Sequence, residues 1–248
     1  MRIFLVLLLL VAMPARAEEV VSGLSQNRIA ITTNFDGSEL LVFGAVKRDA
    51  APPDDPLQVV ITVAGPSDPV VVRRKARQLG IWVNTDAVEV DLAPSFYAVA
   101  TSADWDDTLL AIEDLRHSIS IPRAIRAVGT GSAETEDFVD ALIRIRRDAN
   151  LYQTLIGAVD VNEETLFQTR VVLPANLREG NYTVRFFLTR GGRVISSSAR
   201  EIGVQKVGLE RFLFALAHEQ PLIYGLLSIF IAVGAGWGAS EAFRYMRS

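Results

Sequence analysis

The chain is poor in the side chains that form metal centres and nucleophilic catalytic sites. Cysteine is absent from its 248 residues, and the two histidines, His117 and His218, lie far apart in the sequence. The lack of cysteine excludes disulfides, thiolate ligands and a cysteine nucleophile, and two distant histidines disfavour a histidine-based metal site or triad. We therefore predict no catalytic residue, no metal ligand and no bound cofactor.

Carboxylates are the remaining candidates for chemistry. The densest groups are Asp104, Asp106 and Asp107, and Glu163 with Glu164. Paired carboxylates can perform acid–base chemistry or bind Ca²⁺, but a calcium loop alternates its ligands over about twelve residues around a central glycine, a pattern that is missing here. The Asp104 group stands where a helix is predicted to start, which favours helix capping. Because the sequence also lacks nucleophile-elbow, phosphate-loop and dinucleotide-binding motifs, we expect a non-enzymatic protein.

The first residues have the pattern of a secretory signal peptide. Met1-Arg2 precedes an apolar run over residues 3–12, and Ala15-Arg16-Ala17 is a small-x-small cleavage site. As a helix, the run would span only about 15 Å, half of a bilayer core, which disfavours the alternative of an uncleaved anchor. We predict a signal peptide over residues 1–17 that is cleaved after Ala17.

The C-terminal region has the pattern of a membrane span, because Pro221 to Ser240 contains no charged residue. A helix of this length extends about 30 Å, the thickness of the hydrocarbon core. We therefore predict a transmembrane helix over residues 221–242 rather than a buried core helix. The signal peptide leaves the tail, residues 243–248, in the cytoplasm, and its arginines agree with the positive-inside rule.

Small residues lie on part of this predicted span. Gly234 and Gly238 form a G-x-x-x-G pattern, which allows a second helix to approach closely. We predict that Gly234 and Gly238 contact a helix of an integral membrane partner or of a second copy.

The predicted exported part, residues 18–220, is acidic. Without the four arginines and one glutamate of the two ends, 21 basic and 28 acidic side chains remain, a formal charge of about −7. Nucleic acids require clustered lysine and arginine, so nucleic-acid binding is excluded. An exported body without disulfides favours the periplasm of a Gram-negative bacterium, with the anchor in the inner membrane.

Hydrophobic periodicity divides the exported part into two strand-rich units, residues 18–101 and 154–205, and a helical insertion, residues 102–153. An amphipathic juxtamembrane helix is predicted over residues 206–220, with a last core helix as the alternative. The predicted fold is α+β: a β-sandwich-like, immunoglobulin-like body with a two-helix insertion. The strands expected in the first unit are 29–35, 40–46 (apolar on both faces, as in a central strand), 57–63, 70–72, 82–83, 88–92 and 96–100.

The clearest predicted strand pair is a hairpin around Gly191-Gly192, which can adopt the positive φ angles of a two-residue turn. This turn would place Leu188 opposite Ile195. Tyr182 begins the first strand and is predicted to bond back to upstream backbone, as the corner tyrosine of immunoglobulin-like sandwiches does. A plain core tyrosine is the alternative.

Apolar stripes at helical spacing predict the helices. The first stripe of the insertion is Trp105, Leu109, Ile112 and Arg116, the second is Phe138, Leu142, Ile145 and Ala149, and the juxtamembrane stripe is Leu209, Phe212, Leu213 and Leu216.

Several short motifs resemble those of the putative transmembrane protein family of α-proteobacteria. They are Gly80-Ile81-Trp82-Val83-Asn84, Pro94-Ser95-Phe96-Tyr97-Ala98-Val99, His218-Glu219-Gln220-Pro221-Leu222 with Tyr224-Gly225, and Gly236-Trp237. The resemblance covers nearly the whole mature chain. It implies a signal peptide, a periplasmic body, one C-terminal span and a transport-accessory role, and it supplies no catalytic residue.

Three hypotheses follow. The first is a single-span inner-membrane protein whose periplasmic β-rich domain is a non-enzymatic binding or accessory subunit of a membrane transporter or assembly. The second is a periplasmic small-solute or anion sensor, with arginines near Trp82 and Tyr97 lining a pocket. The third is a membrane-tethered hydrolase, which requires convergent carboxylates. The expected partners are the lipid bilayer and an integral membrane protein or a second copy, without nucleic acid.

Overall fold

The computed structural model describes residues 18–26, 28–31, 37–48, 53, 55–127, 133–206 and 216–246. The predicted signal peptide and most of the predicted juxtamembrane helix lie outside the described residues. The β-rich body and the C-terminal segment are separate compact units, and each is described by itself.

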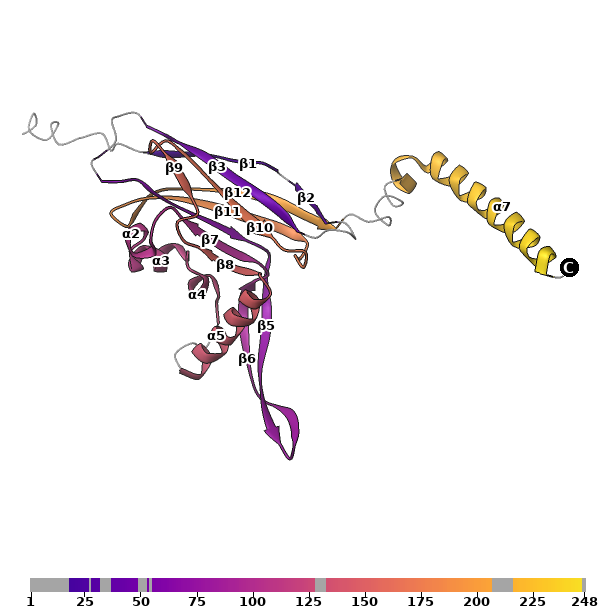
Figure 1. Cartoon of the computed structure of the whole chain (residues 1–248), viewed down its shortest axis with the longest axis horizontal. Coiled ribbons are helices and arrows are strands. Elements are labelled where there is room, and N and C mark those ends of the chain that lie inside the picture. The colour runs from indigo at the N-terminus through magenta and orange to yellow at the C-terminus, as the bar shows by residue number, and fades with distance from the viewer. Residues whose placement is uncertain are drawn as a thin grey trace, which may run out of the picture. The chain divides into compact units, whose positions relative to one another are not determined.

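Within the described residues, the body contains a four-stranded and a six-stranded sheet (Figure 1). The first has the order β1 (Glu19–Leu24), β3 (Ser38–Lys47), β10 (Leu166–Leu173), β9 (Asp160–Asn162). The second has the order β2 (Arg28–Ile31), β12 (Arg193–Lys206), β11 (Gly180–Arg190), β4 (Gln58–Ala64), β7 (Tyr97–Thr101), β8 (Tyr152–Leu155). Strands of both strand-rich units are therefore neighbours in each sheet. The predicted α+β, sandwich-like fold is confirmed.

The two sheets share a core. β10 of the four-stranded sheet alternates buried and exposed residues, whereas β4 and β7 of the six-stranded sheet are buried along nearly their whole length. Every second residue of β10 is buried, from Phe167 to Leu173, as the period of a strand requires. The ring of Phe167 lies 6.0 Å from that of Phe186 on β11, across the interface between the sheets. Burial of one such ring contributes about 1.5–3 kcal/mol. The predicted contact of the corner tyrosine is present as well, since the Tyr182 hydroxyl donates to the Arg178 carbonyl at 2.8 Å.

The predicted turn at Gly191-Gly192 is confirmed, but the predicted strand register is wrong. Both glycines have positive φ angles, 52° and 73°. Leu188 pairs with Ser196 rather than with Ile195, because the register shifts between Leu188 and Thr189. A β-bulge places one extra residue in a strand, and here it leaves Ile195 exposed.

The prediction of buried faces on both sides of residues 40–46 is also wrong. β3 is central in its sheet, yet Phe43 on its outer face is exposed because the core covers only one side of that sheet. The Phe43 ring lies over Gly23 of β1, where an added Cβ would come within 2.7 Å of a ring carbon. The ring therefore covers the strand backbone that Gly23 leaves bare.

The first predicted helix of the insertion is broken into two, α2 (Trp105–Thr108) and α3 (Ala111–His117), and a further short helix, α4 (Ile121–Ala124), follows it. Leu109 and Leu110 between α2 and α3 are extended, and the Leu110 amide donates to the Gly192 carbonyl at 2.8 Å. This contact with the β11–β12 turn interrupts the helix, so Leu109 is buried as predicted whereas Ile112 is exposed.

The second predicted helix is α5 (Ala133–Asp148). Phe138 and Leu142 are buried as predicted, but Ile145 is exposed and Ile143 is buried in its place. Near the C-terminal end of the helix, Arg146 donates to the Ser95 carbonyl at 3.1 Å.

The C-terminal helix, α7 (Pro221–Met246), includes the predicted span. Its stretch from Pro221 to Ala239 has a mean hydropathy of 1.8 and no buried residue. The helix runs into the predicted cytoplasmic tail, because it ends at Met246 rather than near residue 242.

Candidate functional site: the β5–β6 hairpin

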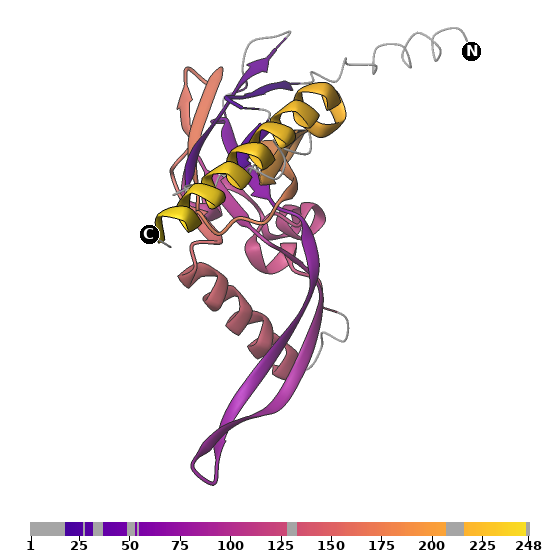
Figure 2. The ribbon, with the colours of Figure 1, turned by 90° about the vertical axis from the view of Figure 1, so that its right-hand side faces the viewer.

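Strands β5 (Ser67–Gln78) and β6 (Ile81–Pro94) form one long antiparallel hairpin (Figures 1 and 2). The short strands predicted over residues 70–72, 82–83 and 88–92 all lie within this hairpin. Leu79 and Gly80 turn the chain with φ angles of 50° and 89°. Positive φ at both central residues is the requirement of a type I′ turn, which asparagine and glycine meet at lower cost than leucine does.

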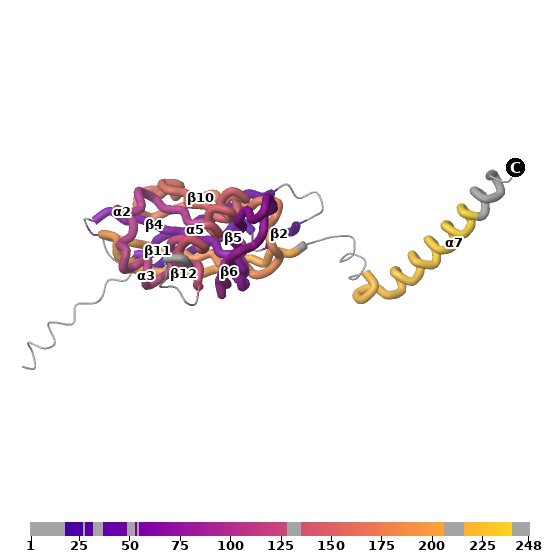
Figure 3. Tube along the Cα trace, turned by 90° about the horizontal axis from the view of Figure 1, so that it is seen from below, coloured from indigo at the N-terminus to yellow at the C-terminus, as the bar shows by residue number. Residues whose placement is uncertain are grey.

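Helix α5 supports only the base of this hairpin. Val72 and Val90 belong to the same buried cluster as Phe138 and Leu142 of α5. Figure 3 shows β5 and β6 beside α5, and the charged end of the contact is an Arg74–Asp137 ion pair at 3.8 Å. The apolar contact with α5 therefore covers only the part of the hairpin next to the body, and the rest of the hairpin extends past it.

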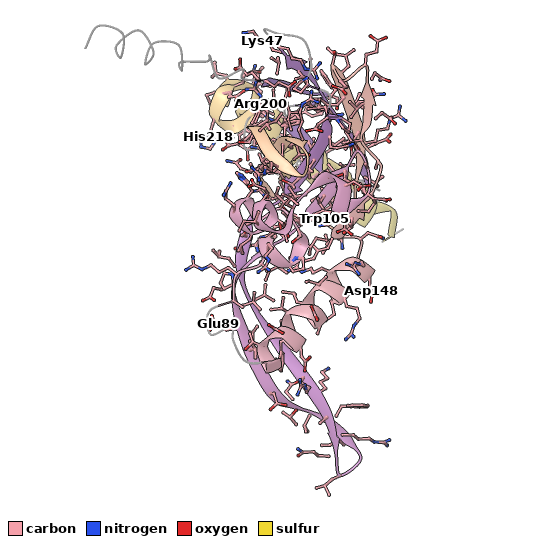
Figure 4. The ribbon with its side chains drawn as sticks, turned by 90° about the vertical axis from the view of Figure 1, so that its left-hand side faces the viewer. Lys47, Glu89, Trp105, Asp148, Arg200 and His218 are labelled. Carbon is pink, nitrogen blue, oxygen red and sulfur yellow. The ribbon has the colours of Figure 1, made fainter. Side chains whose placement is uncertain are left out.

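The outer half of the hairpin is exposed on both faces. In Figure 4 only the far end of the hairpin, beyond the end of α5, carries projecting side chains without another described element alongside. Leu79 is fully exposed, and Ile81 and Trp82 are 64% and 69% exposed; we call these three residues the tip. An isolated two-stranded ribbon is marginal in water, and clustered exposed apolar side chains mark contact surfaces. The tip is thus the part of the body best suited to contact another molecule.

The charge of this region is opposite to that of the body as a whole. Residues 73–85 contain Arg73, Arg74, Lys75 and Arg77 and no acidic residue. Between the inner part of β5 and α5 lies a hollow of about 560 Å³, the root groove, to which Arg144 of α5 contributes another cation. The outer part of β5 therefore carries a group of basic residues next to the apolar tip.

Arginine near Tyr97, which the sensor hypothesis placed in a pocket, instead fixes the helices to the sheet. Arg185 donates to the Tyr97 hydroxyl at 3.1 Å and to the carbonyls of His117 and Ser118 at 2.7 and 2.8 Å. Burial raises the pKa of the Tyr97 hydroxyl above its ordinary value, against the opposing effect of the Arg185 charge. Through these three hydrogen bonds, Arg185 of β11 links the end of α3 to the sheet.

A buried carboxylate lies beside the histidine of α3. Glu113 accepts from Arg116 at 2.7 Å through Oε1, while Oε2 lies 3.5 Å from His117 Nε2 and has no hydrogen bond in the structure. Among the residues described, no group of three potential metal ligands occurs. Neither Glu113 nor His117 lines the root groove between β5 and α5 or either of two other pockets of the body.

A second charged cluster was not predicted. Glu18 accepts from Arg48 at 2.7 Å and from Arg190 at 2.9 Å, and Arg190 also contacts Glu164 at 3.1 Å. Burial opposes ionisation of Glu18, but the hydrogen bonds and charges of Arg190 and Arg48 outweigh it and lower the pKa of the Glu18 carboxyl. No local pattern could reveal this cluster, because its members come from distant parts of the sequence.

The acidic residues predicted to cap a helix lie at the start of α2. Asp104 is the N-cap residue but makes no side-chain capping hydrogen bond, and Asp106 and Asp107 occupy the first turn. Their carboxylates are suited to interact with the helix dipole. Glu164, from the other predicted acidic pair, belongs instead to the ion cluster with Glu18.

The predicted helix-contact residues lie on the surface of α7. A Cβ added at Gly234 or Gly238 would meet no atom within 4 Å. Both positions are therefore accessible to a second helix, and their contact with one stays a prediction.

The sequence as a whole identifies the family. Residues 19–245 match the model of the family described as "Putative transmembrane protein (Alph_Pro_TM)". The chain belongs to this family. The resemblance drawn from its short motifs is confirmed, and membership makes the chain a membrane protein, with α7 as the candidate spanning helix in the described part.

Comparison with other known proteins adds little. No curated protein matches the chain. It is similar to the structure of Spo0M, a sporulation control protein from Bacillus subtilis, at 11% identity and a TM-score of 0.26, over 77% of this chain and 50% of that one. The chain thus spans half the length of that chain. It is also similar to BslA, a bacterial hydrophobin, at 10% identity and a TM-score of 0.20, over 79% of this chain and 98% of that one. At these scores neither structure bears on function.

Proposed function

We propose that the chain is a non-enzymatic, membrane-anchored binding protein, an accessory subunit of an inner-membrane transporter or assembly with its body in the periplasm. The observation that supports this proposal best is the exposed apolar tip of the β5–β6 hairpin. Leu79, Ile81 and Trp82 are exposed and do not belong to the buried cluster that supports the base of the hairpin. Their exposure has a physical rationale if a partner buries them.

The expected partner is an integral membrane protein with an apolar pocket and an acidic rim. Burial of each tip side chain in such a pocket would contribute about 1.5–3 kcal/mol, the size of an interface hot spot. Lys75 and Arg77, on the adjoining part of β5, match an acidic rim. Because α7 holds the body at the same membrane as the partner, the effective concentration of the two is high and a small contact suffices.

Site-specific cross-linking from the tip tests this proposal. A photoreactive residue replaces Trp82 in the full-length chain, and the same residue replaces Leu166 of β10, another exposed apolar position, as the control. We expect position 82 to cross-link to one integral membrane protein in native membranes and position 166 not to. The double variant Ile81→Ser, Trp82→Ala is expected to lose co-purification of that protein, whereas Leu166→Ser retains it.

Two results would contradict the proposal. One is equal recovery of the partner with the double tip variant and with Leu166→Ser. The other is a tip that cross-links only to lipid, with the double variant losing affinity for protein-free vesicles, which would assign the tip to the bilayer.

A small-solute or anion sensor is the second candidate, and the root groove favours it. A ligand between β5 and α5 would restrain the hairpin, so its binding could alter the position of the tip. In a screen of periplasmic solutes, a sensor ligand should both raise the melting temperature of the full-length chain and protect Lys75 and Arg77 from trypsin. If no solute raises the melting temperature or protects these residues, the sensor function is rejected. The tethered-hydrolase hypothesis has no specific observation in its favour and is not proposed.

A further inference from the structure

We propose that the root groove is a binding site for a phosphate group or another doubly charged tetrahedral oxyanion. This inference rests on the second candidate function and deepens it by naming the ligand class and the residues that bind it. The groove lies between two elements that are distant in sequence, the inner part of β5 and the middle of α5. Its volume of about 560 Å³ is in the range of small-ligand sites.

The charge of the groove favours an anion. Arg73, Arg74 and Lys75 line it from β5 and Arg144 lines it from α5, against the two carboxylates of Asp137 and Asp140. The formal excess is two positive charges, within a body that carries an excess of negative charge. The remaining lining residues are apolar: Val72, Phe138, Ala141 and Ile145.

Most of these cations have no intramolecular partner. The side chains of Arg73, Lys75 and Arg144 make no ion pair or hydrogen bond with another described residue. Arg74 lies 3.8 Å from Asp137, and the side chains of this pair are 46% and 74% exposed, so the interaction is weak. The donors of the groove are therefore available to a ligand.

One of the cations is also held in place. The guanidinium of Arg74 lies 4.8 Å from the centre of the Phe138 ring, and Phe138 is anchored in the core. Stacking on an aromatic ring fixes the plane of the guanidinium, which lowers the entropy lost when a ligand binds. Guanidinium groups donate two parallel hydrogen bonds to phosphate oxygens, and a lysine adds a point charge.

A bound phosphate would join Arg74 and Lys75 on β5 to Arg144 on α5. In the structure this part of the contact between hairpin and helix consists of Arg74, through its long ion pair with Asp137 and its stacking on Phe138. A doubly charged ligand therefore adds a link at the point where the support from α5 ends.

The test measures binding of inorganic phosphate by the full-length chain in discs of neutral lipid, by equilibrium dialysis at constant ionic strength with chloride as the reference anion. We expect Arg144→Gln to weaken phosphate binding roughly tenfold, the lower end of what a charge-assisted hydrogen bond contributes. Asp140→Asn is expected to strengthen it, because it removes a like charge from the groove. Arg147→Gln, on the same helix outside the groove, is the matched control and should leave binding unchanged.

A second arm distinguishes a soluble ligand from a lipid headgroup. It measures flotation of the same variants with phosphatidylcholine vesicles that contain phosphatidic acid. Loss of binding in Arg144→Gln but not in Arg147→Gln supports the site in either arm, and the arm in which it occurs identifies the source of the phosphate. Equal binding by Arg144→Gln and Arg147→Gln, in dialysis and in flotation, would overturn the proposed site. If phosphate binds but does not protect the hairpin from trypsin, the binding site is supported and the sensor function is rejected.

Discussion

At the scale of single residues, the ion cluster of Glu18, Arg48, Glu164 and Arg190 joins distant parts of the body. It connects the residue before β1, the residue after β3, the turn between β9 and β10, and the end of β11. The Glu18 side chain is only 11% exposed, so its two arginine partners act in a partly desolvated setting. Loss of one member leaves the opposite charges incompletely paired, which costs more than the loss of a surface pair.

We predict that Glu18→Gln lowers the free energy of unfolding by about 1–3 kcal/mol at neutral pH. The folded pKa of Glu18 is lowered from its ordinary value of 4.5, so its contribution is fully present above that value and is lost as the pH falls through the folded pKa. The difference between wild type and variant should therefore shrink below about pH 4. Urea unfolding of the full-length chain at a series of pH values measures it.

Glu19→Gln is the control for this prediction. The Glu19 side chain is 69% exposed and lies 3.8 Å from Lys47, so its loss should change the stability by less than about 0.5 kcal/mol. Equal effects of the two substitutions would show that the cluster does not stabilise the body.

At the scale of elements, the β5–β6 hairpin combines an exposed position with a strained turn. Leu79 has a φ of 50°, a conformation that glycine and asparagine tolerate and that costs leucine about 1 kcal/mol. The following Gly80 has the conformation that a type I′ turn requires, so the strain belongs to the leucine. An exposed, strained leucine is consistent with a role in contact rather than in folding.

We predict that Leu79→Asn stabilises the chain relative to Leu79→Ala by about 0.5–1 kcal/mol, because only asparagine suits the positive φ angle. Both substitutions remove the apolar contact, so both should reduce cross-linking of the tip to its partner. Thermal unfolding and cross-linking of the two full-length variants separate these effects. If Leu79→Asn unfolds more readily than Leu79→Ala, the turn is not strained as described.

At the scale of the whole molecule, the chain has two units, a β-rich body suited to water and a helix, α7, suited to lipid. The body buries an apolar core between two sheets, whereas α7 is exposed along its apolar stretch, as a helix surrounded by lipid is. On its surface, Gly234 and Gly238 have open space around them, so larger side chains there would not disturb α7 itself. Any effect of such changes therefore reports on contact with another helix.

We predict that changing Gly234 and Gly238 together to leucine abolishes cross-linking of α7 to a second helix in native membranes, because close approach depends on small residues. The control is the same change at Gly225, which lies on α7 outside the G-x-x-x-G pattern and also has open space around it. Unchanged cross-linking in the Gly234, Gly238 variant would remove this face from the interaction.

Local patterns were sufficient for the features that depend on neighbours in sequence. The apolar stretch of α7, the glycine turn at residues 191–192 and the contact of the corner tyrosine each express a spacing of a few residues, and each was predicted. A spacing of this kind reflects the geometry of one helix, strand or turn, so it is present in the sequence before the chain folds.

Contacts between distant segments decided the rest. The helix predicted from Trp105 to Arg116 is interrupted by a hydrogen bond from Leu110 to Gly192, and the Leu188–Ile195 register is displaced by a bulge. The long β5–β6 hairpin is supported by α5, which lies in a later part of the chain, so local patterns indicated only short strands there. The Glu18 cluster and the root groove likewise unite residues with no common local pattern. Free energy from such contacts exceeds the small differences among local conformations, which is why only the folded chain reveals them.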